Sequence, residues 1–574
     1  MISENFKISS VSSTALVIEI VDPSLFEGQF NIGSYVKVPC RGMSDTYVVG
    51  VVDNYRIKDI LGSYPTAAAS PSFLLDVKLV GMLYGAGGAF TFKRGGHGVP
   101  LPPNNGIGIL TKEELSAIYS TGLLKDEKFI FSTLATHSDV KVPINGDKFF
   151  NKHFAIVGAT GSGKSHTVAK VLQSAIAAKA GEYNGLNNSH IVLFDIHGEY
   201  RQAFPTCNYL DSATLNIPYW LFDGEELMEL FIESSESNSY NQVSQFRHAV
   251  IANKKSFSAS EKVFFDSPLK FDIRQVQSYI KNMNSELVNK KKGKIPEDKD
   301  GVQIKDRIAS YFKKEYDFDK VSADFVNGPY TGEFDRFLMR LENTINNPRL
   351  DFLFKDAPGV TIESVLQQFL GYKDEETSNI TVINLSGIPF EALSITVSLI
   401  SRLIFEFGYY YKRSLVSHPQ TEAPILLVYE EAHKYVPRSD MVKYRSSKVA
   451  IERIAKEGRK YGVTLGIVSQ RPSEVSETIF SQCSNYIAMR LTNPDDQAYV
   501  RKLLPDTSGD LISSLPVLQS GEALLIGDAI ALPSMVIIDP CLEKPNSTDI
   551  AYLKEWSKEW HSIDFADIIA PWKS

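Results

Sequence analysis

Hydrophobic and polar residues follow two different patterns along the chain. The first part carries short runs rich in β-branched and aromatic residues, separated by turn residues such as Asp22-Pro23, as is typical of short strands. The runs are Thr14–Val21, Tyr35–Val38, Thr46–Val52 and Phe73–Leu79. Several short strands so close together predict a small β-barrel over residues 1–110. The glycine- and proline-rich stretch Gly85–Gly108 predicts a linker or an ordered long loop, and we extend the linker to about residue 148.

Further along, the apolar runs are continuous and alternate with helical stretches. They are His153–Gly158, His190–Asp195, Ile380–Ser386, Pro424–Glu430 and Val463–Ser469. Uninterrupted apolar strands are typical of a parallel sheet that helices cover on both faces. The sequence therefore predicts an α/β core over residues 149–222 and 359–540.

The segment between these two halves, residues 223–358, lacks strand signals and predicts a helical insertion. Its charged run Asn289–Gly301 predicts an exposed loop, and a solvated tip is favoured over a binding patch. Residues 541–574 form a C-terminal tail. The apolar stretch Ala392–Tyr411 contains Arg402 and Glu406, which favours a buried amphipathic helix over a membrane span.

Composition excludes few classes of function. The 574 residues carry 60 Lys and Arg against 68 Asp and Glu, a net charge of -8, which argues against a wholly basic nucleic-acid coat. A local basic channel remains compatible with that charge. Four widely spaced cysteines form no CxxC pair, so we expect buried free thiols in a reducing cytosol. The N-terminus shows no apolar signal region, and we expect a cytoplasmic protein without membrane contact.

One motif with a defined chemistry follows the first core strand. It fits G-x-x-x-x-G-K-[ST] and consists of Gly158, Ala159, Thr160, Gly161, Ser162, Gly163, Lys164 and Ser165. The glycines allow the backbone N–H groups to surround phosphate oxygens, Lys164 would reach the β- and γ-phosphates, and the Ser165 hydroxyl would ligate Mg²⁺. His166 completes the candidate nucleotide-binding set. A glycine-rich turn that binds nothing is the alternative, but the preceding strand and following helix favour an ATP site.

Acidic and polar residues end two other core strands. Glu430 is the candidate to hold Mg²⁺ through water and Glu431 the candidate general base, although Asp is more usual at the first position. The alternative is a pair of exposed acids at a strand end. Gln470 is a candidate sensor of the γ-phosphate. Arg459 and Arg471 are the two candidates for an arginine finger that acts on a neighbouring subunit's nucleotide.

The stretch from Met441 to Tyr461 is strongly basic. It follows the strand of Glu431 closely, so hydrolysis could move it. We expect its cations to hold a DNA backbone without reading bases, with Lys443, Arg445 and Lys448 as the best candidates.

These motifs resemble the HerA-like ATPases of the HerA/FtsK branch of P-loop motors. The matching pieces are HFAIVGATGSGKSHT, FDIHGEY, RLENTINNPRLDFLF, VYEEAH, AKEGRKYG, IVSQRPSEVS, GEALLIG and LPSMVIID. The resemblance implies a RecA-like P-loop core and a homohexameric ring that translocates double-stranded DNA with ATP and Mg²⁺. It also implies a separate effector, such as a NurA-like nuclease or a sirtuin-like NADase, in DNA-end processing or anti-phage defence.

The resemblance adds two acidic candidates to the site. Asp195, at the strand end in FDIHGEY, becomes a candidate for the nucleotide site, and Glu199 is a weaker one. A helix N-cap is the alternative role for Asp195.

Two other functions use the same nucleotide site. In one, the ring is a scaffold that assembles and controls an effector, with ATP as a switch and no processive movement. In the other, a metabolic kinase, the protein would need a lid over a small substrate, and none is obvious in the sequence. DNA-stimulated hydrolysis would distinguish the motor from the scaffold.

Overall fold

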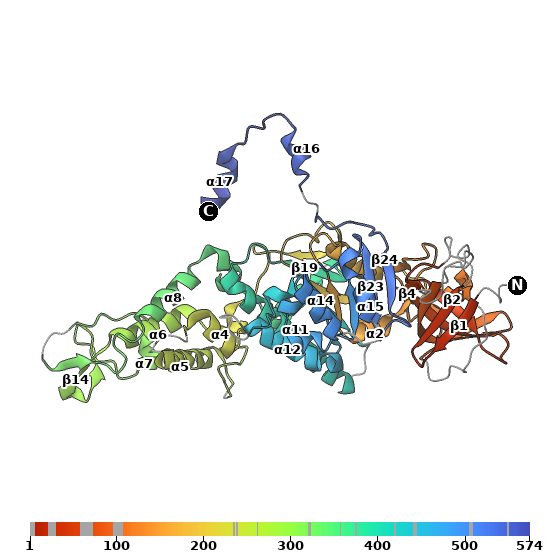
Figure 1. The fold of residues 1–574 in the computed structure, drawn as a ribbon. Helices are drawn as coiled ribbons and strands as arrows, with labels where there is room; N and C mark the ends of the chain where they lie inside the picture. The colour runs from red at the N-terminus through yellow and green to blue at the C-terminus, as the bar shows by residue number, and fades with distance from the viewer. Residues whose placement is uncertain are drawn as a thin grey trace, which may run out of the picture.

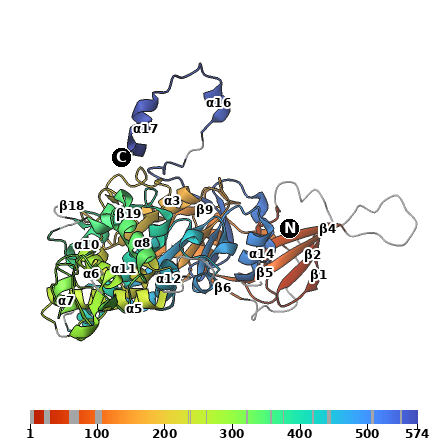
Figure 2. The same ribbon diagram turned by 90° about the vertical axis from the view of Figure 1, so that its left-hand side faces the viewer.

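The computed structural model describes residues 6–20, 30–57, 73–95, 107–233, 236, 239–260, 262–319, 323–355, 358–373, 376–417, 421–439, 445–503, 509–547 and 550–573. The molecule is elongated (Figure 1). An N-terminal sheet lies at one end, a large α/β body in the middle and a mainly helical lobe at the other end. The C-terminal segment with α16 (Tyr552–Trp556) and α17 (Phe565–Lys573) extends away from the body in both views (Figures 1 and 2).

The N-terminal sheet has seven antiparallel strands in the order β1-β2-β5-β4-β3-β7, with β6 paired to β5. They are β1 (Phe6–Val11), β2 (Ala15–Ile20), β3 (Tyr35–Pro39), β4 (Thr46–Ile57), β5 (Phe73–Ala86), β6 (Ala89–Arg94) and β7 (Gly108–Ile109). The four predicted strands are confirmed as β2 to β5. The linker prediction was wrong at β6 and again after residue 107, where α1 (Lys112–Ser120) and β9 (Ser132–Leu134) lie. Residues 96–106 of that stretch lie outside the described part. Within that part no pairing joins β1 to β7, so the closed barrel stays a prediction.

The central sheet has ten strands in the order β13-β19-β12-β20-β21-β11-β22-β23-β24-β9. Seven are parallel: β11 (Phe154–Val157), β12 (His190–Asp195), β13 (Asn208–Leu210), β19 (Ile380–Asn384), β20 (Ile425–Tyr429), β21 (Val463–Ser469) and β22 (Asn485–Ala488). β23 (Glu522–Gly527), β24 (Ser534–Ile538) and β9 (Ser132–Leu134) continue the sheet in antiparallel pairing. The prediction of a parallel sheet was therefore correct for the five expected strands and wrong for this edge, where residues 489–521 separate β22 from β23 and β9 comes from the segment before β11.

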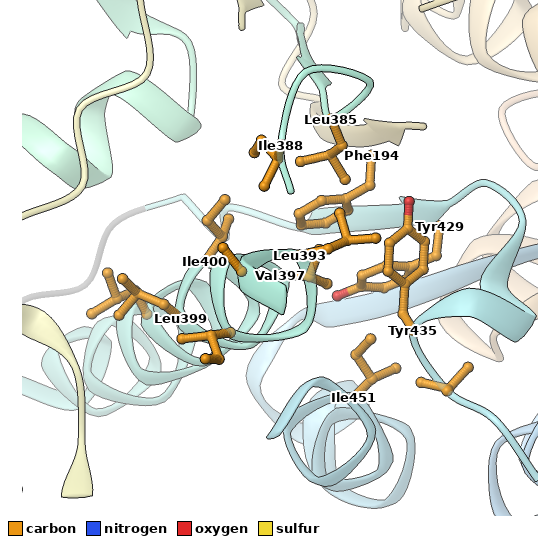
Figure 3. Close-up of a cluster of buried hydrophobic side chains, with 14 of the residues drawn as sticks. Phe194, Leu385, Ile388, Leu393, Val397, Leu399, Ile400, Tyr429, Tyr435 and Ile451 are labelled. Atoms are coloured by element: carbon orange, nitrogen blue, oxygen red, sulfur yellow. The ribbon is translucent and has the colours of Figure 1, made fainter. Parts of the chain in front are cut away.

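Side chains of the parallel strands alternate between two hydrophobic cores, as the period of a strand requires. In β12, Val192 and Phe194 belong to one core, and Ile191 and Leu193 to the other. The first core packs against α11 (Phe390–Ser417), and Figure 3 shows Phe194 and Tyr429 beside that helix. The second core packs against α3 (Lys164–Ala177). The buried helix predicted at Ala392–Tyr411 is thus confirmed as α11. No helix in the described ranges is long and apolar enough to cross a membrane.

The remaining elements of the body are short. They are α1 (Lys112–Ser120), β8 (Lys128–Phe129), β10 (Ile144–Asn145), α2 (Gly146–Asn151), α10 (Ile362–Phe369), β17 (Tyr372–Lys373), β18 (Glu376–Thr377), α12 (Ser446–Glu457), α13 (Glu477–Phe480), α14 (Pro494–Leu503) and α15 (Gly509–Ile512). All four cysteines are free, as predicted; Cys40, Cys483 and Cys541 are buried, and Cys207 is half-buried.

The predicted insertion is mainly helical but also contains a small sheet. Its helices are α4 (Gly224–Phe231), α5 (Ser239–Phe257), α6 (Ile273–Ser285), α7 (Arg307–Tyr311), α8 (Asp335–Ile345) and α9 (Asp351–Phe354). The lysine-rich run was wrongly predicted to lack strands, because β14 (Leu287–Asn289) pairs with both β15 (Ile295–Pro296) and β16 (Phe325–Asn327). Lys291 and Lys292 pair with Asp324 and Glu297, each at 2.8 Å, which agrees with a solvated tip.

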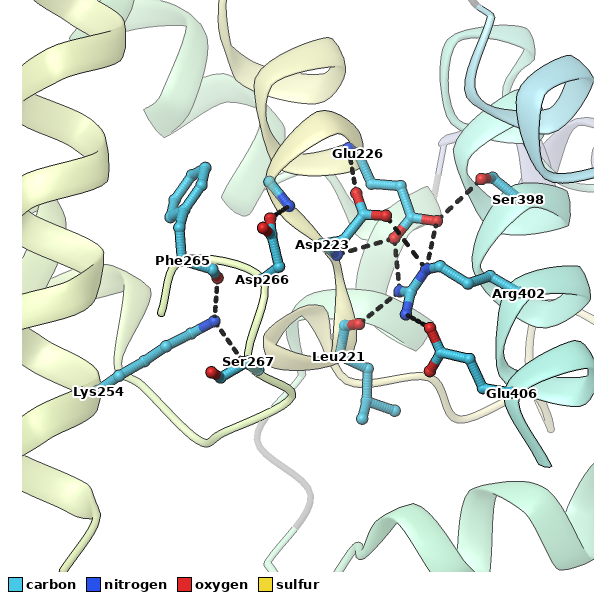
Figure 4. Close-up of polar contacts among 11 residues, drawn as sticks. Leu221, Asp223, Glu226, Lys254, Phe265, Asp266, Ser267, Ser398, Arg402 and Glu406 are labelled. Carbon is cyan, nitrogen blue, oxygen red and sulfur yellow. Dashed lines mark hydrogen bonds and ion pairs between the residues drawn. The ribbon is translucent and has the colours of Figure 1, made fainter. Parts of the chain in front are cut away.

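A buried ion pair joins this insertion to the core (Figure 4). Arg402 of α11 donates from Nη2 to Glu226 Oε2 at 2.8 Å and to the Leu221 carbonyl at 2.8 Å, and its Nε lies 3.3 Å from Asp223 Oδ2. Ser398 Oγ donates to Glu226 Oε1 at 2.9 Å. The Glu226 side chain is 1% exposed, and burial raises its pKa against the opposing effect of Arg402. Glu226 therefore depends on Arg402 to carry its charge inside the protein.

Replacing Arg402 should destabilise the protein strongly. Arg402→Ala leaves the Glu226 carboxylate buried without its cation, and we expect a loss of about 3–5 kcal/mol in the free energy of unfolding. Denaturant unfolding followed by circular dichroism measures the loss. Arg413→Ala on the exposed face of the same helix is the matched control. Equal losses for the two variants would contradict this account of the ion pair.

Candidate nucleotide site

The loop after β11 has a backbone that requires glycine. Gly161 and Gly163 have φ angles of 73° and 99°, in the left-handed region that side chains disfavour. At Gly158 an added Cβ would lie 2.6 Å from Ser162 Oγ and 2.8 Å from Met489 Cβ. α3 begins directly after Gly163, so the loop faces the positive end of that helix.

This loop forms one wall of a cavity of ≈ 760 Å³ at the carboxyl edge of the parallel strands. Ten of the candidate residues line it: Thr160, Gly161, Gly163, Lys164, Ser165, His166, Glu199, Glu430, Glu431 and Gln470. Gly158, Ala159 and Ser162 belong to the loop but do not line the cavity. The structure thus brings the loop residues together with both glutamates and the glutamine, although β20 and β21 lie far from the loop in sequence.

Lys164 and Gln470 are held by polar contacts inside the cavity. Lys164 Nζ donates to the Ala159 carbonyl at 3.3 Å, and Thr160 Oγ1 donates to Gln470 Oε1 at 2.7 Å. Burial lowers the pKa of Lys164, while Glu431, Glu430 and Glu199 oppose that shift. The ammonium is therefore matched by carboxylates in this wall and available to phosphate oxygens.

Glu430 is almost completely buried, at 4% exposed. Its Oε1 accepts a hydrogen bond from the Tyr200 hydroxyl at 3.2 Å, and its Oε2 has no partner among the described residues. Burial raises the pKa of Glu430 well above its usual range, and Asp195, Glu199 and Glu431 raise it further. A cation in the cavity would satisfy the free oxygen and favour the ionised carboxylate.

The donor set fits Mg²⁺. The described residues contain no cluster of three His, Cys, Asp or Glu side chains able to enclose a metal ion. The cavity instead offers the hydroxyl of Ser165 and glutamate carboxylates. Mg²⁺ is commonly held in this way, through few protein oxygens together with water and substrate phosphates.

Glu431 follows its strand in a strained conformation, with a φ of 47°. For a residue other than glycine this costs roughly 1–2 kcal/mol. Its Oε2 accepts from the Gln470 backbone N–H at 3.4 Å and lies 3.3 Å from His433 Nδ1. Burial lowers the pKa of His433, which favours the neutral ring next to the carboxylate. Strain of this kind is frequent at catalytic sites, where it aims a side chain.

Asp195 lies beside the cavity but does not line it. Its Oδ1 accepts the backbone N–H groups of His197, Gly198 and Glu199 at 3.2, 2.8 and 3.2 Å, and its Oδ2 accepts that of Tyr200 at 3.0 Å. The carboxylate thus fixes a turn in the manner of a cap, although no helix follows. Its contact with nucleotide stays a prediction.

The two candidate arginines lie beyond opposite ends of the same strand, β21. Arg471 follows β21 near the cavity, is exposed and pairs with Glu474 at 2.8 Å. Arg459 is exposed and precedes β21, so the length of that seven-residue strand, about 23 Å, separates it from its own loop. Neither arginine lines the cavity, and their roles stay predictions.

The structure adds residues that sequence reasoning missed. Arg490, directly after the run that contains β22, donates from Nη2 to the Gly161 carbonyl at 3.2 Å. Its position after the apolar run NYIAM was a usable signal. Pro540, Lys544 and Ser547 also line the cavity, and the Asn546 backbone N–H donates to the Glu199 carbonyl at 2.8 Å. No local pattern could place that tail segment here.

The three residues predicted to contact DNA differ in their surroundings. Lys443 lies outside the described residues. Arg445 is exposed, and its backbone N–H donates to Glu229 Oε2 at 2.9 Å. Lys448 is 8% exposed, with Nζ donating to the Arg438 carbonyl at 3.3 Å. The prediction of Lys448 as a DNA-facing cation was therefore wrong for this conformation, because its helix turns that side chain inward.

Comparisons with known proteins agree with this site. The family model described as "Helicase HerA, central domain" matches residues 130–404, which contain the loop. A "Probable DNA double-strand break repair helicase HerA" of Methanocaldococcus jannaschii is 27% identical over 536 residues, covering 88% of this chain and 93% of that protein. The chain is thus similar in sequence to HerA helicases over most of its length. A "DNA double-strand break repair helicase HerA" of Sulfolobus acidocaldarius is 28% identical, covering 80% of this chain and 78% of that protein.

Solved structures similar to this chain include two bacterial proteins. The conjugative coupling protein TrwB is 11% identical, with a TM-score of 0.44 over 77% of this chain and 94% of that chain. VirB4 of Thermoanaerobacter pseudethanolicus is 13% identical, with a TM-score of 0.44 over 73% of this chain and 98% of that chain.

Two substitutions should separate nucleotide binding from hydrolysis. Lys164→Ala removes the ammonium from the phosphate side of the cavity, so we expect ATP binding and hydrolysis both to be lost. Glu431→Gln retains the shape but removes the base, so we expect ATP binding to persist while turnover falls by about 10²–10⁴-fold. Binding of a fluorescent ATP analogue and phosphate release measure the two steps. Turnover of Glu431→Gln equal to that of the parent would refute its role as the base.

Proposed function

We propose that this ATPase is a motor that moves along double-stranded DNA as a homohexameric ring. The single observation that carries the proposal is the cavity, in which the phosphate-binding loop faces two buried glutamates and Gln470. The relatives at 27–28% identity, which are named DNA double-strand break repair helicases, support DNA as the track.

The residues of the cavity have complementary roles in ATP hydrolysis. Lys164 and the loop N–H groups bind the phosphates, and Ser165 and Glu430, the latter through water, hold Mg²⁺. Bound Mg²⁺ would neutralise part of the negative charge on the phosphate oxygens. Glu431 accepts a proton from the attacking water at its carboxylate, and Gln470, linked to Thr160, responds to the γ-phosphate.

A ring explains the position of Arg459. A guanidinium about 23 Å from its own loop has no access to the γ-phosphate within one subunit. Between neighbours, the edge that carries Arg459 can face the next cavity and stabilise charge there. Arg471 is the second candidate, but its ion pair with Glu474 would have to break first.

The alternative is a nucleotide-switched scaffold that assembles and controls an effector without processive movement. Both functions use the same cavity. In either case we propose a separate effector, a nuclease or an NAD-consuming protein, in DNA-end processing or anti-phage defence. Identifying the copurifying protein tests that part.

DNA should stimulate hydrolysis if the ring is a motor. We expect the ATPase rate to rise with long double-stranded DNA of any sequence, and binding to weaken linearly in log affinity against log salt, because contacts are to phosphates. The measurement is an ATPase titration with and without the copurifying effector. No binding and no stimulation at low salt in either condition would favour the scaffold.

Mixed rings should show which arginine acts between subunits. Neither Glu431→Gln nor Arg459→Ala subunits should hydrolyse ATP efficiently alone. Mixing them creates interfaces with an intact base on one side and an intact arginine on the other, and should restore part of the activity. The control mixes Glu431→Gln subunits with Arg471→Ala subunits in place of Arg459→Ala subunits. Full activity of a monomer in sedimentation would contradict the ring.

A further inference from the structure

The hydroxyl of Ser165 already has a carboxylate partner. Ser165 Oγ donates to Glu199 Oε2 at 2.8 Å, and both residues line the cavity. A hydroxyl that donates a hydrogen bond to a carboxylate keeps its oxygen lone pairs free on the other side. That is the orientation in which a serine oxygen can ligate a cation.

Glu199 is held in place from two sides. The carboxylate of Asp195 accepts the backbone N–H of Glu199 at 3.2 Å and those of its neighbours, which fixes the turn. The Asn546 N–H donates to the Glu199 carbonyl at 2.8 Å. The Glu199 backbone is therefore anchored, and only its side chain faces the cavity.

Glu430 has a different environment. Its Oε1 is occupied by the Tyr200 hydroxyl, and its 4% exposed side chain leaves Oε2 as a free oxygen for a cation or a cation-bound water. Tyr200 comes from the same turn as Glu199. One turn thus sets both contacts: Glu199 accepts from the Ser165 hydroxyl, and Tyr200 donates to Glu430.

The charges in the cavity also require a cation. Glu199, Glu430 and Glu431 line the cavity together with Lys164 and Lys544, so carboxyl groups outnumber lysine side chains there. Incoming ATP adds further negative charge. A divalent cation between the carboxylates and the phosphates offsets this repulsion.

We propose that Glu199 is a positioning residue for Mg²⁺: it accepts a hydrogen bond from the Ser165 hydroxyl and thereby directs the oxygen of Ser165 to the metal of bound Mg–ATP. This inference rests on the proposed Mg–ATP site and adds to it a role for Glu199. Glu430 holds the metal through water independently of Ser165.

The test measures metal affinity rather than turnover. Mn²⁺ replaces Mg²⁺ and is followed by electron paramagnetic resonance with a non-hydrolysable ATP analogue bound. We expect Glu199→Gln to weaken Mn²⁺ binding by about 10–100-fold, the usual effect of losing a partner of a metal ligand. Binding of the analogue in EDTA should be unchanged, because the loop and Lys164 are intact. Glu182→Gln, an exposed glutamate outside the cavity, is the matched control.

A double-mutant cycle makes the role specific. If Glu199 acts through Ser165, then Ser165→Ala and Glu199→Gln should each weaken Mn²⁺ binding, and the double variant should be no weaker than Ser165→Ala. Additive losses, or unchanged Mn²⁺ affinity in Glu199→Gln, would overturn the inference. If Glu199→Gln fails to bind the analogue in EDTA, Glu199→Asp takes its place in the same cycle. A parent protein that binds no nucleotide would instead refute the proposed function.

Discussion

The register of the parallel strands is the constraint on which the rest of the site depends. Val157 pairs with Ser469 and Phe194 with Tyr429, so the loop, Asp195, Glu430 and Gln470 all emerge at one edge of the sheet. Side chains alternate along a strand, and a slip by one residue would exchange the residues that face the two cores. The hydrophobic cores on both faces therefore also fix the positions of the polar residues.

Burial has opposite effects on the groups gathered at that edge. It lowers the pKa of Lys164 and raises that of Glu430, so without ligand both groups are pushed towards their neutral forms. Phosphate would favour the ammonium and a divalent cation would favour the carboxylate. Binding of Mg–ATP would thus stabilise the ionised states that burial disfavours.

Much of this arrangement could be predicted from the sequence, because its signals are local. The loop motif, the five apolar strands and the acidic pair are contiguous patterns, and α11 was distinguished from a membrane span by Arg402 and Glu406. The antiparallel edge was missed because its pairings are non-local: α14 and α15 separate β22 from β23, and β9 comes from the segment before β11. The contact of Ser165 with Glu199 and the wall formed by Pro540, Lys544 and Ser547 depend on tertiary packing, which no local pattern encodes. The prediction of Lys448 as a DNA-facing cation was wrong for the same reason, since amino-acid composition does not tell which face of α12 is buried.

The same packing connects the loop to the distant arginine. His153, at the start of the P-loop strand, accepts the Leu465 N–H at Nδ1 and contacts the Ala455 carbonyl through Nε2, each at 3.0 Å. These contacts require a neutral ring that donates from Nε2, and burial lowers the pKa of His153 to about 4, which maintains that form at neutral pH. Ala455 is four residues before Arg459, so the base of the P-loop strand and the arginine segment are joined by one side chain. If the proposed ring forms with Arg459 as its finger, His153 links the strand of one nucleotide loop to the segment of the arginine proposed to act on the next.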